Sequence, residues 1–512
     1  MSTGVVGMLI VIVMYLIMMV AIGAYYSRRN YSEGDYYLGG RRLGPIITAM
    51  SAEASDMSSW LLMGLPGVAM LTGCAEAVWT AIGLAIGTYF NWLIVSKKLR
   101  RYSHKINAIT IPDFFSNRYK DGSKSLMAVS AIIIVVFFIP YTASGFAACG
   151  KLFSTLFDAP YFPAMLLSAV IIVAYTALGG FLAASTTDLI QSCVMTFALV
   201  VVVFFGVYTA GGLDSVGENA SQLPGYLNLT SIYDPSTNSA APYSILTIAS
   251  TMAWGFGYFG MPHILLRFMG IRDEKELVLS RRIATIWVVI AMGVAIFTGI
   301  IGYSMVQAGV IDPATDSSEA EKLMIKIAML LSTKGVGAII IGGLILAGIL
   351  ACTMSTSDSQ LLAASSGISK NLIQDCFGLK LTEKQALLLA RCTVIFIAIV
   401  AVFLAKNPDS SVFRIIQFAW AGFGSAFGPT VLIALYWKRS NRWGALFGML
   451  SGAAMVFIWK FGIATLGGAF AIYELLPAFF IGGIVNVLIS LATKAPEQEI
   501  IDTFEHVNEF AD

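Results

Sequence analysis

The sequence predicts an all-helical integral membrane protein, organised as one membrane domain over residues 1–512. Hydrophobic residues make up 57% of the chain and charged residues only 12%, about half the charged share of a soluble domain. A window of about 20 residues, the length of a spanning helix, finds thirteen apolar segments. Glycines and prolines, with polar side chains in the earlier one, interrupt two of these segments, and such interruptions are typical of binding sites inside a membrane.

The spans follow one another along the whole chain. The first, 5–25, has no Lys or Arg before it and exceeds the apolar core of a signal peptide, so we expect it to remain. The stretch 321–332 is apolar on one face only and too short to span, which predicts a helix in an external loop. The other spans lie at 46–68, 75–96, 126–150, 162–183, 186–211, 244–268, 283–308, 336–370, 386–405, 411–436, 443–463 and 473–493.

Charge placement predicts the orientation, because Lys and Arg collect in cytoplasmic segments. With the N-terminus outside, those segments hold 25 of the 32 basic residues. The loop 211–242 has no Lys or Arg, as expected outside the cell. The C-terminal tail, 494–512, is then cytoplasmic, and its acidic run predicts a solvated segment.

Two repeats of inverted topology must each contain an odd number of spans. Interrupted spans at matching positions in the two halves of a chain indicate such repeats. Spans two and seven are both interrupted and lie five apart. We therefore expect a five-plus-five core, with a first repeat at 46–211 and a second at 244–436. Residues 1–45 and spans twelve and thirteen, 443–493, are then peripheral.

The second span carries Glu53, Asp56 and several serines before a Gly-Leu-Pro-Gly sequence. A carboxylate near the middle of a bilayer costs roughly 2.5–3.5 kcal/mol or more. Such an acid is either neutralised by an arginine in a structural pair or belongs to an ion or substrate site. The neighbouring serines and glycines weaken a continuous helix, which favours the site.

Two later segments supply matching polar groups. Span seven holds Gly255, Gly257, Gly260 and Pro262 within eight residues, among aromatic side chains that line either a pocket or an ordinary core. A broken helix exposes backbone donors and carbonyls. Span nine carries a polar run at 352–360, and hydroxyl oxygens suit hard cations. The scattered cysteines and histidines predict neither disulfides nor a transition-metal site.

Four motifs carry a family resemblance: SAEASDMSSWLLMGLPG at 51–67, WGFGYFGMPHILLRFM at 254–269, MSTSDSQLLAASS at 354–366 and AWAGFGSAFGPTVL at 419–432. They resemble the sodium/solute symporter family, and within it the bacterial sodium/proline symporters. The similarity runs in order along the chain. It implies a leucine-transporter-type fold with thirteen helices and a five-plus-five inverted core, in agreement with the hydropathy and charge patterns.

The resemblance also implies roles for individual residues. It implies a sodium site made by backbone oxygens of Ala54, Met57 and Cys352 and by the hydroxyls of Ser355 and Thr356. It ties sodium coupling to Asp56, Asp188, Ser51 and Arg41. It places substrate contacts at Ser58, Trp60, Tyr141, Trp254, Tyr258 and Pro262.

Three residues depart from the family pattern. Cys352 stands where Ala is usual, Ser59 where Gly is common, and Glu53 where Gly or Gln is common. The change at Cys352 is harmless if only its carbonyl is used. Glu53 lies one turn before Asp56 and adds a second acid that either pairs with a basic group or alters ion affinity.

The resemblance implies sodium-coupled uptake of L-proline across the cell membrane, with Na⁺ as coupling ion and no organic cofactor, nucleic acid or obligate protein partner. Another small carboxylate, such as pantothenate or a sialic acid, and proton coupling through Glu53 and Asp56 remain alternatives. We expect no enzyme: the chain has neither a GxxxxGK[ST] loop nor a Gly-x-Ser-x-Gly motif with an intramembrane histidine. The tail is also too short to fold into a signalling domain.

Overall fold

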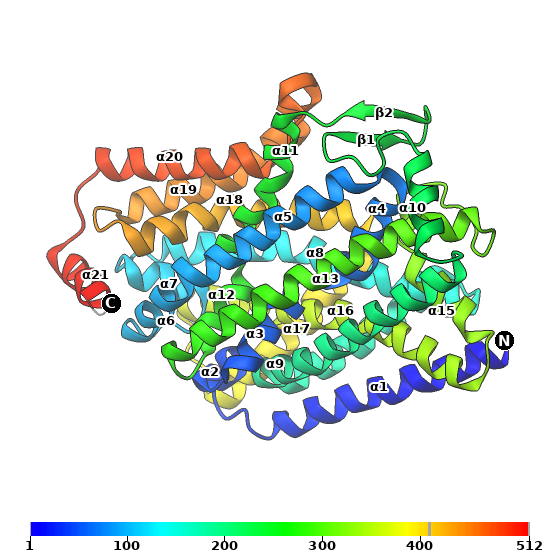
Figure 1. Ribbon diagram of the computed structural model, residues 1–512. Coiled ribbons are helices and arrows are strands. Elements are labelled where there is room, and N and C mark those ends of the chain that lie inside the picture. Colours follow the sequence, from blue (N-terminus) through cyan, green and yellow to red (C-terminus); the bar gives the residue numbers. More distant parts are fainter. Residues whose placement is uncertain (1, 408–410, 510–512) are drawn as a thin grey trace.

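The protein is a bundle of long helices whose two termini lie at opposite ends (Figure 1). The computed structural model describes residues 2–407 and 411–509. Within these ranges, ten helices are long and apolar enough to cross a membrane. They are α1 (Thr3–Ser27), α5 (Cys74–Phe90) with its continuation α6 (Ser96–Lys105), α8 (Ser125–Phe157), α9 (Tyr161–Thr209), α13 (Leu277–Gln307), α16 (Val336–Ser366), α17 (Glu383–Leu404), α18 (Val412–Tyr436), α19 (Arg442–Phe461) and α20 (Leu475–Ala492).

The longest helix, α9, consists of two limbs joined by a sharp reversal at Gly180. This residue has φ 66° and ψ −165°, a conformation open mainly to glycine. Before the reversal, Tyr175 packs against Gly23 of α1. After it, the Gln191 amide donates a hydrogen bond to the Tyr15 hydroxyl at 3.1 Å. Both limbs therefore run back along α1 from one turn, and they correspond to the fifth and sixth predicted spans.

The second and seventh predicted spans are interrupted helices. The second consists of α3 (Pro45–Asp56), a wide turn at Trp60–Gly64, and α4 (Leu65–Thr72). The seventh consists of α11 (Ile245–Met252), the 3₁₀ turn η4 (Ala253–Gly260) and α12 (Pro262–Gly270). Each predicted span thus has a helical counterpart. The number of crossings and the division into repeats at 46–211 and 244–436 stay predictions.

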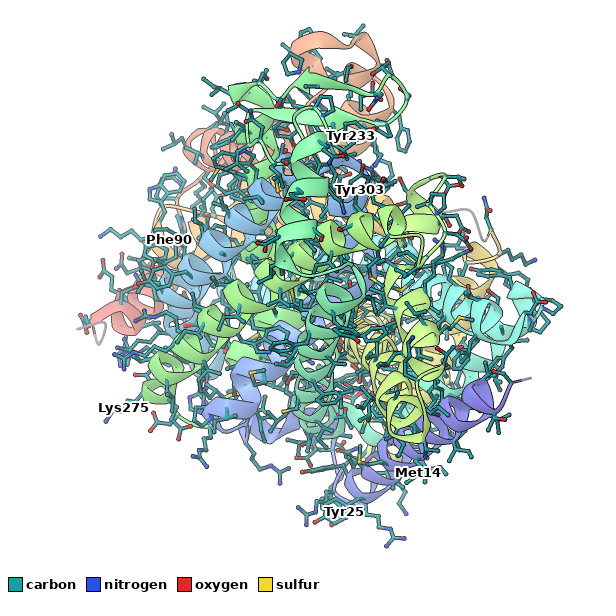
Figure 2. The ribbon with its side chains drawn as sticks, turned by 45° about the vertical axis from the view of Figure 1, so that its right-hand side comes forward. Met14, Tyr25, Phe90, Tyr233, Lys275 and Tyr303 are labelled. Atoms are coloured by element: carbon teal, nitrogen blue, oxygen red, sulfur yellow. The ribbon has the colours of Figure 1, made fainter. Side chains whose placement is uncertain are left out.

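Packing divides the bundle into two sets of helices. The first set contains the interrupted helices together with α5 and α13, which pack against them. The second set contains α8, α16 and α17 together with the first limb of α9, where the Tyr161 hydroxyl donates to the Ala405 carbonyl after α17. Helix α18 lies between the sets, against η4 on one side and α8 on the other. Helix α1 lies outside, and Met14 and Tyr25 project from it away from the bundle (Figure 2).

Short elements cover the two ends of the bundle. We call one end the basic face: it carries α2 (Glu33–Leu38), α6, α7 (Ile111–Arg118) and α21 (Gln498–Glu509). We call the other the N-terminal face: it carries α10 (Leu213–Gln222), a hairpin of β1 (Ser231–Asp234) and β2 (Ser239–Pro242), α14 (Ser317–Ala320) and α15 (Leu323–Ser332). Helix α15 confirms the short helix predicted at 321–332, whereas the hairpin was not predicted.

The prediction of a solvated tail is wrong for residues 498–509. They form helix α21, which packs against α6 on the basic face (Figure 1). Ile500, Phe504 and Val507 are buried there. Their spacing places them on one side of a helix, so the acidic residues occupy the other sides. The segment is therefore an amphipathic helix, which its many acidic residues made difficult to recognise in the sequence.

Candidate functional site

The predicted cation ligands meet where α3 ends beside the middle of α16. The Ser355 hydroxyl donates to the Ala54 carbonyl at 2.8 Å. The hydroxyls of Ser355 and Thr356 each lie 3.2 Å from the Cys352 carbonyl. All these residues are buried. Ala54 belongs to the last turn of α3, where helix carbonyls lose their intrahelical donors.

Met57 lies just beyond this cluster, and its carbonyl accepts from the Leu61 amide at 3.0 Å. The structure therefore brings Ala54, Cys352, Ser355 and Thr356 together and places Met57 in the adjoining turn. A buried set of hydroxyl and carbonyl oxygens with no nitrogen or sulfur donor suits a hard cation such as Na⁺. The residues present fit that ion.

Asp56 is the last residue of α3 and faces the aromatic groups of η4. The Tyr258 hydroxyl donates to its Oδ2 at 2.5 Å, and the Tyr141 hydroxyl lies 3.5 Å from its backbone carbonyl. A cavity of about 10 Å³ opens beside the carboxylate, which is room for about one water molecule. Its lining consists of Asp56, Trp60, Leu84, Tyr141, Trp254, Ile416 and Trp420.

Trp254 is the centre of an aromatic cluster around this cavity. Its ring lies 5.9 Å from that of Trp60 and 5.6 Å from that of Phe413. Its backbone carbonyl, within η4, accepts from the Trp420 indole at 2.7 Å. Gly257 permits this approach, because a Cβ there would lie 1.8 Å from the indole nitrogen.

Sequence reasoning missed the residues that α18 contributes: Phe413, Ile416 and Trp420. Only the glycines of the AWAGFG segment signalled a close helix contact here. Three predicted substrate residues do not line the cavity: Tyr258, which reaches it only through Asp56, and Ser58 and Pro262. The Ser58 hydroxyl accepts from the Trp60 amide at 3.2 Å, with Ser58 at an uncommon φ of 22°. Pro262 begins α12.

A buried ionic network separates the cavity from the basic face. Asp188 Oδ2 accepts from Arg267 Nη2 at 3.1 Å and from the Ser51 hydroxyl at 2.6 Å. Arg267 also donates to Ser359 at 2.5 Å. Asp358, next to Ser359, accepts from the Tyr175 hydroxyl at 2.8 Å. The network joins α3 and α12 to α9 and α16. Arg267 was not among the predicted site residues.

The N-terminal face is closed by a second buried pair. Lys151 Nζ on α8 lies 2.7 Å from Glu321 Oε2. The Glu321 carboxylate also accepts from the backbone amides of Val412 and Phe413 at the start of α18. Since Phe413 packs on Trp254, this pair ties the loop before α15 to the aromatic cluster.

Glu53 and Arg41 take positions that the sequence left open. Both hydrogen bonds to Glu53 reach Oε1, from Thr88 at 3.0 Å and from the Trp92 indole at 2.9 Å. Among the described residues, no basic group forms an ion pair with Glu53.

Arg41 lies on the basic face and donates to the carbonyls of Met269 and Ala108, both at 2.6 Å. It is thus separate from the hydroxyl cluster.

The sequence and the fold both have known relatives. Residues 36–452 match the model of the Sodium:solute symporter family. The chain is 42% identical over 502 residues to a sodium/proline symporter of Haemophilus influenzae, with 97% of each chain covered. It is 40% identical to the osmoregulated proline transporter OpuE of Bacillus subtilis, with 94% of each chain covered.

Two solved structures share the fold. One is a Na⁺-coupled sialic acid symporter in a substrate-bound outward-open state, with a TM-score of 0.77 and 16% identity over 96% of this chain and 99% of that one. The other is MHP1, a nucleobase-cation-symport-1 family transporter in a closed conformation, with a TM-score of 0.55 and 12% identity over 92% and 98%. The expected transporter fold is confirmed.

We predict that Arg267→Gln strongly destabilises the protein. The change leaves the Asp188 carboxylate buried without its cation, a loss of about 3–5 kcal/mol. Arg272→Gln is the matched control, because Arg272 pairs with Glu276 on the surface and such pairs contribute about 0–1 kcal/mol. Thermal unfolding in detergent, followed by size-exclusion chromatography, measures both. Equal midpoints for the two variants would contradict the structural role of the network.

Proposed function

Because the chain belongs to the sodium:solute symporter family, we propose that it takes up L-proline together with Na⁺. Membership makes it a transporter and not an enzyme. The full-length similarity to proline transporters, at about 40% identity, carries the choice of substrate. An inward Na⁺ gains about 2.3 kcal/mol per 100 mV of membrane potential, in addition to its concentration gradient. This driving force can concentrate a neutral zwitterion.

The sodium site in this proposal consists of the carbonyls of Ala54, Met57 and Cys352 and the hydroxyls of Ser355 and Thr356. The short Ser355–Ala54 contact supports it, because the same two oxygens can turn toward a shared ion. The ion would neutralise partial charges at the end of α3 and hold α3 of the first set against α16 of the second set. Sodium binding would thereby favour closure around the substrate.

In this proposal proline binds at the aromatic cavity, with its ring against Trp60, Trp254 and Trp420 and with Tyr141 behind it. The cavity now admits only about one water molecule, so the lining helices must move apart to receive the ring. Asp56, held by Tyr258, couples the two sites because it lines the cavity one residue away from the sodium ligand Met57. The ring offers three methylenes worth about 0.8 kcal/mol each on burial. A small aromatic cavity suits such a ring better than it suits the larger carbon skeleton of a sialic acid.

The remaining predicted residues act on the path to the basic face. Ser51 and Asp188 belong to the network with Arg267, which must separate before a solute can leave in that direction. Arg41 holds the end of α12 through Met269 and the α6–α7 turn through Ala108. Ser58 and Pro262 shape the two breaks. In this proposal these residues support coupling without contacting the ion.

The direct test is proline-dependent ²²Na⁺ uptake into proteoliposomes that contain only this protein. We expect proline to stimulate sodium uptake, and an excess of pantothenate or a sialic acid to leave proline uptake unchanged. Proline uptake driven by a proton gradient without sodium would favour the proton-coupled alternative. Competition by either of the larger carboxylates would assign the substrate to them.

We predict that Thr356→Ala raises the sodium concentration needed for half-maximal uptake by about tenfold or more, because an interaction with a charged partner contributes about 1.5–3 kcal/mol. The set of accepted solutes should not change. Thr353→Ala is the matched control, since Thr353 is buried one turn earlier and donates to the Ile349 carbonyl of its own helix. A Thr356→Ala protein with the sodium response of the wild type would remove this hydroxyl from the site.

The proposal places the basic face in the cytoplasm. In a cysteine-free background we predict that a cysteine at Ser221, exposed on the N-terminal face, reacts with an impermeant maleimide on intact cells. A cysteine at Lys494, exposed on the basic face, should react only after permeabilisation. The reverse pattern would invert the orientation, and labelling of both sites on intact cells would contradict the proposed crossings.

A further inference from the structure

Helix α21 is fastened to the basic face by one apolar side. Ile500, Phe504 and Val507 point into the protein. The Phe504 ring lies 5.2 Å from the guanidinium carbon of Arg118 at the end of α7. The ring of Tyr102 on α6 lies at 5.2 Å from the same carbon. The aromatic faces of the tail helix and of α6 therefore flank one cation on α7.

Three polar contacts surround this apolar side. Glu499 pairs with Lys120, just after α7. Glu505 Oε1 lies 2.8 Å from the Nζ of Lys438, after α18. Asn508 Oδ1 accepts from Lys98 on α6 at 2.7 Å. The acidic tail is thus complementary to a basic surface contributed by three separate segments.

These segments belong to different parts of the bundle. Helix α6 continues α5 and also packs against α12, so it is part of the first set. Helix α7 leads into α8 of the second set, and Arg118 Nε donates to the Ala434 carbonyl of α18 at 3.1 Å. A single short helix therefore bridges the first set to the second set and to α18, at one end of the molecule.

We propose that α21 is a strap that holds the basic face closed and releases when that face opens. Transporters with this type of fold alternate by moving one group of helices against the other around a fixed site. Opening toward the basic face would draw α6 away from α7 and α18. The contacts of α21 to both sides would then be lost, so docking of the tail stabilises the closed arrangement.

The chemistry of Arg118 makes the strap reversible. Its side chain is buried, and Nη1 and Nη2 have no hydrogen-bond partner among the described residues. Burial of a charge without such partners is unfavourable, and the flanking rings offset only part of this by cation–π attraction. The surrounding ion pairs are largely exposed and contribute little. Undocking exposes Arg118 to water, so the strap opens at a modest free-energy difference.

The test measures the separation of the two sets across the basic face without sodium or proline. Spin labels go on cysteines at Lys275, exposed just before α13 (Figure 2), and at Lys384, exposed at the start of α17, in the full-length cysteine-free protein in nanodiscs. We expect Phe504→Ala to raise the fraction of molecules with the longer label-to-label distance about fivefold. This factor is the low end of the range in which one site changes the equilibrium at a distant one. Removal of residues 497–512 should raise it at least as much.

Two matched variants distinguish loss of the α21 contacts from nonspecific destabilisation of the protein. Phe504→Tyr keeps an aromatic ring over Arg118 and should give the wild-type distances. Asp502→Ala alters an exposed position of α21 and should also leave them unchanged. Wild-type distances in both Phe504→Ala and the truncated protein would overturn the proposal, as would an equal shift in Asp502→Ala. The readout needs no transported solute, so it stands whether or not proline is the substrate.

Discussion

The bilayer requires every backbone donor and acceptor to be satisfied inside the protein, and the two interrupted helices are where this requirement shapes the molecule. At the break in α3, the Ala54 carbonyl accepts from the Ser355 hydroxyl. At the turn in η4, the Trp254 carbonyl accepts from the Trp420 indole. At each interruption a backbone carbonyl thus accepts a hydrogen bond from a side chain of another helix. The side chains that bond to these backbone carbonyls, Ser355 and Trp420, also belong to the two candidate binding sites.

The same constraint governs the buried charges. Arg267 with Asp188, on the side of the basic face, and Lys151 with Glu321, on the side of the N-terminal face, are both almost fully buried. Each pair joins two elements that lie far apart in the chain. A buried ion pair adds little net stability but is costly to break by removal of one partner. Such pairs therefore define a discrete closed arrangement, which agrees with the small cavity between them.

Much of the fold could be predicted from sequence, since spanning helices depend on local hydropathy. The structure has one helical element, α9, over the two spans predicted at 162–183 and 186–211, with a kink at Gly180 between them. The tail was misjudged because its charges outnumber Ile500, Phe504 and Val507, whose spacing was visible in the sequence. The hydroxyls at Ser355 and Thr356 were found through a motif. Trp420 and Arg267 were missed because their roles depend on segments far away in the chain.

By itself, the sequence determined the membrane environment, the approximate spans, the two interruptions and the family, because these properties lie in local composition and contiguous motifs. Only the tertiary structure decided which groups meet. It gave Glu53 the uncharged partners Thr88 and Trp92 in place of a basic residue, turned Asp56 toward Tyr258 and the aromatic cavity, and set α21 across α6 and α7. Such pairings depend on how helices pack at long range, and local hydropathy carries no information about them.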